Sequence, residues 1–524
     1  MKFKKIVCSV LASAMALTAF AGCGSKSNDY KVNMNINPAE KKIALKGLMP
    51  HFGAETSPNE DYTAKTVERV TGYKVTYDEL LSGTNANTDL NTKMLDNAKY
   101  NFMKLTADQF ADYAKYMLPL DDVLEKFGPE LMKKDVISQE SWDVVTINGK
   151  ICGIPERASS DNIENPIVIR KDWLDELNLA MPTTTTEFRD MLVAMKNKYN
   201  VAPLTFDKYT PLVYPVSAAF GIYTEWQEYE IEGKKEVRYY MDAPGYADYV
   251  DYMAGLYKDG LIDPSVSTNE AANALQRFGG KDKDTGETKA GAYACSLWDV
   301  DGIVSSLSAA GIISADKAKT EVPETLCYLR SLKNANGEYK VYRTSGYTYI
   351  TCIPLWMAKN AGYVIDWINS KLTDTEGAHN FRDIVLGEEN THWTYDALEE
   401  AYQPILTNFD QMNYASYFLT GSNEGVYTDY WKARIKKMPE MARAWELLME
   451  DADTVGVRNI TDAIPPLEKY AKVRSVIEPY AQDKFYVMLI DDKGSSKLSE
   501  YLKTFKDDGG KQATEAISGW YFKK

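Results

Sequence analysis

The sequence lacks an excess of positive charge. Its 60 lysines and arginines are outnumbered by 75 aspartates and glutamates, which gives a formal net charge of -15 at pH 7. Lys2, Lys4 and Lys5 belong to an N-terminal leader, and without these three charges the rest of the chain carries -18. Because phosphate binding needs a basic surface, we expect no nucleic acid partner.

Histidine is scarce, and the catalytic motifs that depend on it are missing. His51, His379 and His392 are the three histidines, and the chain has neither an HExxH nor a GxSxG motif. Carboxylate pairs for glycoside hydrolysis are conceivable among 75 acidic residues, but the sequence does not give their separation. We therefore expect that the protein is not an enzyme, and we assign no catalytic residue.

Cysteine is sparse and widely spaced. Six cysteines are present, and four of them fall in the part expected to fold: Cys152, Cys295, Cys327 and Cys352. No pair has the CxxC spacing of a zinc site, so we expect neither a metal nor another cofactor. The even number leaves disulfides possible, although buried free thiols are the preferred interpretation.

Long hydrophobic runs are confined to the N-terminus. The apolar stretch Ile6–Phe20 follows three lysines and is shorter than the roughly 20 residues that span a membrane. It ends in Phe20-Ala21-Gly22-Cys23, which resembles the lipobox of bacterial lipoproteins. This resemblance implies a signal peptide over 1–22 and lipidation of Cys23; an ordinary secretory signal with an incidental cysteine is the alternative.

Residues 23–40 are polar and contain too few apolar side chains to pack, so they are predicted to form a flexible tether. Two acyl chains on Cys23 would anchor the protein stably, because a single chain binds membranes only marginally. We expect this lipid to be the only membrane contact, since no second run approaches the length of a spanning helix.

What the sequence does contain is enough apolar material for a large core and many aromatic side chains. With 44% hydrophobic and 26% charged residues, the chain after position 40 is expected to form at least two lobes. The 36 tyrosines and 10 tryptophans exceed ordinary usage. Most are expected in the core, but aromatic faces also line sugar-binding clefts.

Local patterns predict an α/β protein with a helical C-terminus. A strand over 43–48, a helix over 62–71 that stops at Gly72, and a strand over 73–77 form an α/β unit. Asn148-Gly149 predicts a hairpin turn, and Thr184 with Glu187 predicts a capping box. Residues 89–134 are expected to be mostly helical, as is almost the whole chain after Thr428.

Four segments in combination are typical of one protein family. They are the hairpin INGKICGIP over 147–155, the element IRKDWL over 169–174 with the Pro182-Thr183-Thr184 that follows it, YPVSAAFG over 214–221, and LYKDGLIDP over 256–264. Together they resemble extracellular solute-binding protein family 1, the large carbohydrate-binding lipoproteins of ABC importers. The resemblance covers residues 41 to 400.

This resemblance implies a periplasmic-binding-protein-like α/β fold, in which two lobes are joined by hinge crossings and close around a ligand in the cleft. Lobe 1 is expected to contain residues 41–160 with 345–395. Lobe 2 is expected to contain residues 161–344 with 396–524, including a helix-rich C-terminus.

Six residues are predicted to contact the ligand: Trp298, Asp299, Trp393, Glu389, Glu156 and Arg157. The pairs 298–299 and 389–393 each combine an aromatic ring, which stacks on a sugar face, with a carboxylate that accepts hydroxyl protons. The alternatives are a core tryptophan with a helix-starting aspartate for the first pair, and packing at a helix end for the second. Arg157 is alternatively a surface charge.

The resemblance implies the lipid-anchored substrate-binding component of an ABC importer. The expected partners are an oligosaccharide and the permease subunits in the membrane, and the protein is expected to be a monomer on the extracytoplasmic face of the cell membrane. A peptide-binding or sensory lipoprotein with the same fold remains an alternative, as does a surface glycan-degrading enzyme.

Overall fold

A computed structural model describes residues 30–523, except 54–55, 84, 158–161, 283–285, 287 and 315–324. The predicted signal peptide, Cys23 and the start of the tether lie outside the described residues. None of the helices in the described part of the chain combines the length and apolar character that a membrane crossing requires.

Lobe 1 is built on a five-stranded mixed sheet in the order β2-β1-β3-β14-β6. β1 pairs in parallel with β2 and β3, whereas β14 runs antiparallel to β3 and β6. The strands are β1 (Leu45–Met49), β2 (Val75–Glu79), β3 (Phe102–Thr106), β6 (Ile154–Arg157) and β14 (Tyr347–Cys352).

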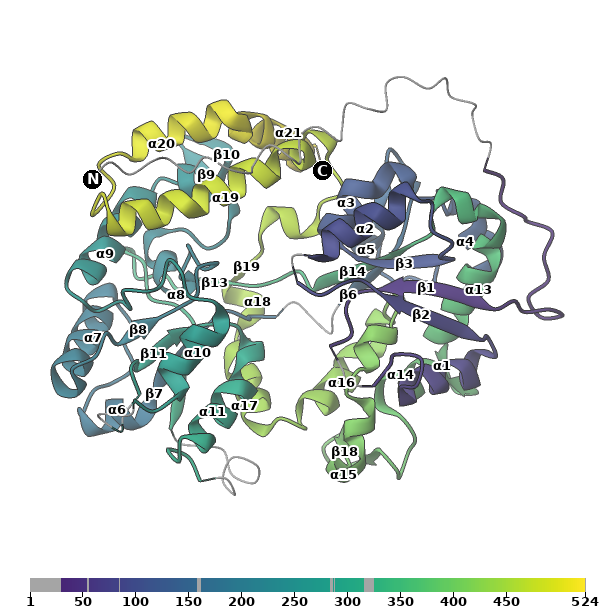
Figure 1. Cartoon of the computed structure of the whole chain (residues 1–524), viewed down its shortest axis with the longest axis horizontal. Coiled ribbons are helices and arrows are strands. Elements are labelled where there is room, and N and C mark those ends of the chain that lie inside the picture. The colour runs from purple at the N-terminus through teal and green to yellow at the C-terminus, as the bar shows by residue number, and fades with distance from the viewer. Residues whose placement is uncertain are drawn as a thin grey trace, which may run out of the picture.

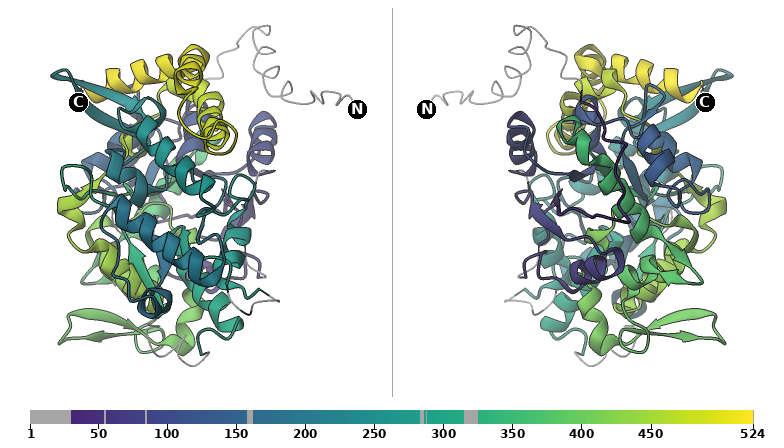
Figure 2. Two further views of the ribbon diagram at one scale, coloured as in Figure 1. Left: turned by 90° about the vertical axis from the view of Figure 1, so that its left-hand side faces the viewer. Right: turned by 90° about the vertical axis from the view of Figure 1, so that its right-hand side faces the viewer.

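Helices cover this sheet and form one hydrophobic core with it, seen on the right of Figure 1. They are α1 (Tyr62–Thr71), α2 (Asn85–Leu95), α3 (Ala107–Tyr113), α4 (Asp121–Phe127), α5 (Gln139–Val144), α13 (Ala361–Leu372), α14 (Asn380–Leu386), α15 (Leu406–Phe409) and α16 (Glu424–Ile435). Three antiparallel hairpins lie in this lobe outside the main sheet: β4 (Thr146–Ile147) with β5 (Lys150–Ile151), β15 (Asp374–Thr375) with β16 (Ala378–His379), and β17 (Trp393–Asp396) with β18 (Ala401–Pro404). The β17–β18 hairpin projects at the lower edge in green (Figure 2).

Lobe 2 contains a four-stranded sheet in the order β12-β7-β11-β8. The strands are β7 (Ile167–Arg170), β8 (Leu204–Thr205), β11 (Ala292–Ala294) and β12 (Leu326–Leu329). Its helices are α6 (Lys171–Glu176), α7 (Thr185–Tyr199), α8 (Tyr214–Ser217), α9 (Tyr246–Lys258), α10 (Ala271–Gly279), α11 (Val300–Ala309) and α17 (Pro439–Met449).

The C-terminal helices belong to lobe 2. α19 (Glu468–Ile490), α20 (Leu498–Phe505) and α21 (Lys511–Tyr521) lie across its top in yellow (Figure 1). α19 packs on α9, and α21 packs on the hairpin of β9 (Trp226–Ile231) and β10 (Lys234–Tyr239). Ile477, Phe485 and Ile517 are fully buried in the core of this lobe.

The chain passes between the lobes three times: from β6 to β7, from β13 (Val341–Tyr342) to β14, and from α16 to α17. After the third passage, α18 (Ala452–Val455) leads to β19 (Gly456–Val457), which pairs in parallel with β13. The segment that follows includes a 3-10 turn, η8 (Ile460–Ala463), and reaches α19 along the space between the lobes.

Several local predictions are confirmed. α1 ends at Gly72, whose φ of 68° is left-handed, and Thr184 and Glu187 form both hydrogen bonds of a capping box at the start of α7. Asn148 and Gly149 have φ values of 51° and 77°, as a type I′ turn requires.

One prediction about the chain's organisation is wrong. Residues 396–434, expected in lobe 2, pack in the core of lobe 1, where Phe409, Phe418 and Tyr427 are buried. The chain therefore crosses to lobe 2 after α16, later than expected.

The stretch 89–134, expected to be mostly helical, contains the end of α2 together with α3 and α4. It also contains the strand β3, which is buried because it lies between β1 and β14 at the centre of the sheet.

Candidate functional site

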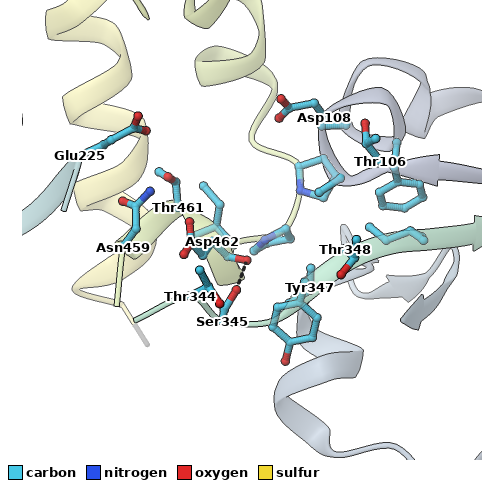
Figure 3. Close-up of a pocket in the computed structure, with 18 of the residues that line it drawn as sticks. Thr106, Asp108, Glu225, Thr344, Ser345, Tyr347, Thr348, Asn459, Thr461 and Asp462 are labelled. Atoms are coloured by element: carbon cyan, nitrogen blue, oxygen red, sulfur yellow. Dashed lines mark hydrogen bonds between the residues drawn. The ribbon is translucent and has the colours of Figure 1, made fainter. Parts of the chain in front are cut away.

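A cavity of about 630 Å3 lies between the lobes, and we call it the first chamber. Lobe 1 contributes the start of α3 at Thr106–Asp108, and β14 contributes Tyr347 and Thr348 (Figure 3). The opposite wall comes from Glu225, from the segment 459–467 and from α19. Because both lobes and two connecting segments line it, its shape depends on how the lobes are oriented.

A second chamber of about 450 Å3 adjoins the first, and Trp298 and Thr348 line both. Its wall is mainly aromatic, formed by Trp298, Tyr349, Tyr417, Tyr427 and Trp431. Its polar lining includes Glu156 and Asn162. Aromatic faces beside a few polar groups are the surface that carbohydrate rings require, since a sugar has an apolar face and a rim of hydroxyls.

Trp298 stands at the junction of the two chambers. It lies in a 3-10 turn, η4 (Leu297–Asp299), that follows β11, and its side chain remains 42% exposed. Its ring meets that of Trp431 edge-on, with centroids 5.2 Å apart. It also neighbours Glu164: burial raises the pKa of Glu164, and Trp298 and the Asn162 amide, which donates to Glu164 at 3.3 Å, counteract that shift.

Carboxylates gather on the lobe 2 side of the first chamber. Burial, together with the nearby charges of Glu478 and Asp462, raises the pKa of Glu225 to about 7. Burial likewise raises the pKa of Asp462 to about 6, although a 3.1 Å hydrogen bond from the Tyr342 hydroxyl counteracts it. Tyr470 donates to Glu478 at 2.6 Å. Near neutral pH the three carboxyl groups of Glu225, Asp462 and Glu478 therefore carry fewer than three negative charges in total.

Beneath the second chamber is a buried ion pair. Lys104 of β3 lies 2.7 Å from Glu156 of β6, and both side chains are less than a tenth exposed. Lys104 also donates to the carbonyls of Ser416, Tyr417 and Leu419, and these bonds hold the loop that carries the Tyr417 wall. Burial lowers the pKa of Lys104 and raises that of Glu156, and each partner counteracts the shift of the other.

Arg157 stabilises the hinge. Its guanidinium lies over the Tyr347 ring at 5.4 Å and donates to the Ser345 carbonyl at 3.2 Å, and it lies 3.7 Å from Glu140 of α5. Arg157 thus links two of the three chain crossings, and it does not line either chamber.

A second arginine connects the lobes directly. Arg474 of α19 donates to the carboxylate of Asp108, to its carbonyl at 2.9 Å, and to Asp112 at 3.2 Å. Both aspartates belong to α3 of lobe 1. This interlobe link closes one end of the first chamber.

Four of the six predicted ligand contacts do not line the chambers: Asp299, Trp393, Glu389 and Arg157. The Asp299 carboxylate caps its own turn by accepting a 3.0 Å hydrogen bond from the Ser296 amide. Trp393 is 2% exposed in the lobe 1 core and donates to the Gly387 carbonyl at 2.9 Å. Glu389 is exposed in the loop before β17. Asp299 and Trp393 agree with the alternatives stated for them, a helix-starting aspartate and a packed tryptophan, whereas Glu389 is exposed and does not pack.

Trp298 and Glu156 do line the chambers, together with residues that the sequence did not single out. The main additions are Glu164, Glu225, Tyr342, Tyr349, Tyr417, Trp431, Asp462 and Glu478. The run Tyr347-Thr348-Tyr349 at the start of β14 was a usable signal, since two rings and three hydroxyl groups directly follow a crossing.

Sequence comparison identifies distant relatives. No protein-family model matches the chain. The fructooligosaccharide ABC transporter substrate-binding protein FusA of Streptococcus pneumoniae is 24% identical over 72% of this chain and 71% of its own. Lipoprotein LipO of Bacillus subtilis is 20% identical over 98% of this chain and 97% of its own.

Structural comparison agrees in architecture. The alginate-binding protein AlgQ2 superposes with a TM-score of 0.66 over 90% of this chain and 97% of its own, at 17% identity. FusA in complex with fructo-nystose gives 0.65 over 92% and 99%, at 16% identity. By their names, FusA is a substrate-binding protein for fructooligosaccharides and AlgQ2 binds alginate. The chain therefore has the two-lobed α/β fold of solute-binding proteins.

Proposed function

We propose that this protein is the lipid-anchored substrate-binding component of an ABC importer and that it captures an oligosaccharide between its lobes. The permease subunits of the importer are its partners in the membrane. The observation that carries the proposal is the pair of adjoining chambers, whose wall joins Trp298, Trp431 and three tyrosines to several carboxylates. The names of FusA and AlgQ2 support a carbohydrate as the ligand class.

In this proposal a sugar ring stacks on the open face of Trp298 at the junction of the chambers. Tyr349, Tyr417 and Trp431 enclose neighbouring rings, and Glu156, Glu164 and Asp462 accept hydroxyl protons. Two adjoining chambers favour an oligosaccharide over a single sugar. Each chamber falls within the range of about 300 to 1,000 Å3 that encloses a whole small ligand, so the pair has room for more than one ring. The three crossings are the hinge that lets the lobes separate for entry.

The first test is a thermal-shift and scattering screen of the chain from residue 24 onward against oligosaccharides. A true ligand at a hundredfold excess over its dissociation constant adds about 2.7 kcal/mol to the free energy of unfolding. For a protein of this size the melting temperature then rises by only a few degrees, so the ligand must be saturating. The same ligand is expected to reduce the radius of gyration and to be recovered chemically unaltered. Tight binding without compaction would contradict hinge closure, and a cleaved product that tracks the purified protein would indicate a hydrolase.

The second test concerns the anchor. Wild-type protein is expected to fractionate with membranes and to carry diacylglycerol on Cys23, whereas Cys23→Ala is expected to stay unprocessed or to be released. Mass spectrometry of the N-terminal peptide measures the mass of the lipid. Cys152→Ala is the control, because Cys152 is buried inside lobe 1. A soluble wild-type protein with no lipid would show that the leader is an ordinary secretory signal.

A further inference from the structure

The chambers are lined by far more negative than positive charge. Six carboxylates reach them: Asp108, Glu156, Glu164, Glu225, Asp462 and Glu478. Arg474 is the one cation among the described residues that line either chamber.

The cations near the chambers are already engaged, including Lys371, which lies near Glu156 and donates to the Phe418 carbonyl and the Thr420 hydroxyl. Arg474 is bound to Asp108 and Asp112 of α3, and Lys104, beneath the second chamber, is bound to Glu156. Neither cation is free to receive an acidic group of a ligand. Of the six carboxylates, only Asp108 and Glu156 are matched by these cations.

Glu225 is the carboxylate that is most available to a ligand. No hydrogen bond joins its side chain to another residue in the described part of the protein, although it lies deep beside the chamber. Figure 3 shows it on the wall opposite Asp108, near Asn459 and Thr461. By contrast, Asp462 and Glu478 each accept a hydrogen bond from a tyrosine hydroxyl.

The groups that face Glu225 cannot neutralise a second negative charge. They are two carboxylates, Glu478 and Asp462, and five tyrosine hydroxyls, Tyr214, Tyr239, Tyr240, Tyr342 and Tyr470. Burial raises the pKa of every one of these tyrosines, so they remain uncharged donors at physiological pH. An acidic group placed here would face like charges in a cavity of low polarity, where repulsion is strong.

Hydroxyl groups fit the same surroundings. A sugar hydroxyl donates to a carboxylate and accepts from a donor, and the second chamber offers such a donor: the Trp431 indole nitrogen is buried and has no hydrogen-bond partner among the described residues. A buried donor without a partner is costly, and a ligand oxygen at this position would satisfy it.

On the basis of the proposed function, we propose that Glu225 is a specificity-determining residue and that the cleft accepts oligosaccharides without acidic groups and rejects uronides of the same length. Glu225 accepts hydroxyl protons of a neutral ring, and its negative charge opposes a ring carboxylate at the same position. The substrate class is thus a neutral, hydroxyl-rich oligosaccharide.

The test compares matched pairs of ligands by calorimetry at pH 8. Each pair consists of a neutral oligosaccharide and its counterpart oxidised to the carboxylate at C6, and the pairs cover gluco-, galacto- and manno-oligomers; kestose and nystose complete the neutral set. The tightest binder is expected to be neutral, and where it has a C6 carboxylate counterpart, that form is expected to bind at least about thirtyfold more weakly. Glu225→Gln is expected to reduce this ratio to below about fivefold, because the amide keeps the acceptor oxygen and removes the charge.

Glu228→Gln is the matched control. Glu228 lies on β9, three residues after Glu225, forms an ion pair with Lys235 at 2.8 Å and lines neither chamber. The ratio is also expected to shrink at pH 5.5 in the wild type, where Glu225 takes up a proton, and to change much less with pH in Glu225→Gln, where Asp462 is the nearby group that still titrates in this range. A uronide as the tightest binder, or a ratio that Glu225→Gln leaves unchanged, would overturn the inference while leaving sugar binding intact. If no saccharide of either kind binds, the proposed function itself is wrong and the inference falls with it.

Discussion

Trp298→Ala is expected to weaken binding of the true ligand about thirtyfold, a loss of about 2 kcal/mol that is typical of a buried aromatic anchor. The ring provides the stacking face where the two chambers meet, and its orientation is fixed by Glu164 and Trp431. The unliganded melting temperature is expected to change little, because 42% of the side chain is exposed without ligand. Calorimetry and a thermal melt of the same preparation measure both quantities.

Two variants make this result specific. Trp298→Tyr keeps a flat aromatic face and is expected to recover most of the affinity. Trp393→Ala removes a core side chain that is 2% exposed, and is expected to lower the free energy of unfolding by about 3 to 5 kcal/mol with little effect on the affinity of the folded molecules. If Trp298→Ala instead destabilises the free protein as strongly and leaves the affinity unchanged, its ring supports the fold and not the ligand.

Lys104→Met is expected to lower the free energy of unfolding by about 3 to 5 kcal/mol, because it leaves the Glu156 carboxylate buried without its partner. It also removes the three hydrogen bonds from Lys104 to the carbonyls of residues 416, 417 and 419. The melting temperature is then expected to fall by about 3 to 5 °C, because the unfolding entropy of a protein of this size is about 1 kcal/mol per degree. Because the loop of Tyr417 loses its support, ligand affinity is expected to fall as well.

Lys46→Met is the matched control for this experiment. Lys46 forms an ion pair with Asp78 at the same 2.7 Å, but both side chains are more than 40% exposed. Exposed pairs contribute 0 to about 1 kcal/mol, so the melting temperature of this variant is expected to stay near that of the wild type. Equal effects from the two lysines would mean that burial of the Lys104–Glu156 pair has no energetic consequence.

The fold was more predictable from the sequence than the site. Gly72, the Asn148-Gly149 turn and the capping box of Thr184 depend on the conformational preferences of single residues, which operate locally and survive in the folded chain. The third crossing was misplaced because the residues after 395 that pack in the core of lobe 1 carry no local pattern that assigns them to that lobe. Which lobe a helix packs against is decided by contacts distant in sequence.

The strand β3 illustrates the same limit. Phe102-Met103-Lys104-Leu105 contains a lysine, so its pattern does not indicate a buried strand, yet Lys104 is 1% exposed. It is tolerated because Glu156 lies opposite, more than fifty positions later in the chain. A pairing of this kind cannot be identified until the sheet order is known.

The predicted ligand contacts differ in how deeply their side chains are buried. The spacing of residues in the sequence does not indicate burial. Trp298 directly precedes a carboxylate and Trp393 follows one by four positions, but Trp298 faces a chamber and Trp393 fills a core. Glu225 and Trp431 carry no local signal, because each reaches the chambers only through the relative position of the two lobes. The ligand roles of Trp298 and Glu156 stay predictions until binding is measured.

The contact of Arg474 with α3 has a consequence for the timing of transport. Its hydrogen bonds form only while the lobes are close, so they increase the population of closed molecules even before a ligand arrives. Asp108 is largely exposed, which limits the bias to at most about 1 kcal/mol, a factor of about five between closed and open forms. An empty molecule that is already closed cannot accept a ligand, so the apparent affinity falls in proportion to the open fraction. The same bonds slow the release of a ligand once it is enclosed. They therefore lengthen its residence time and lower the rate at which free ligand is captured.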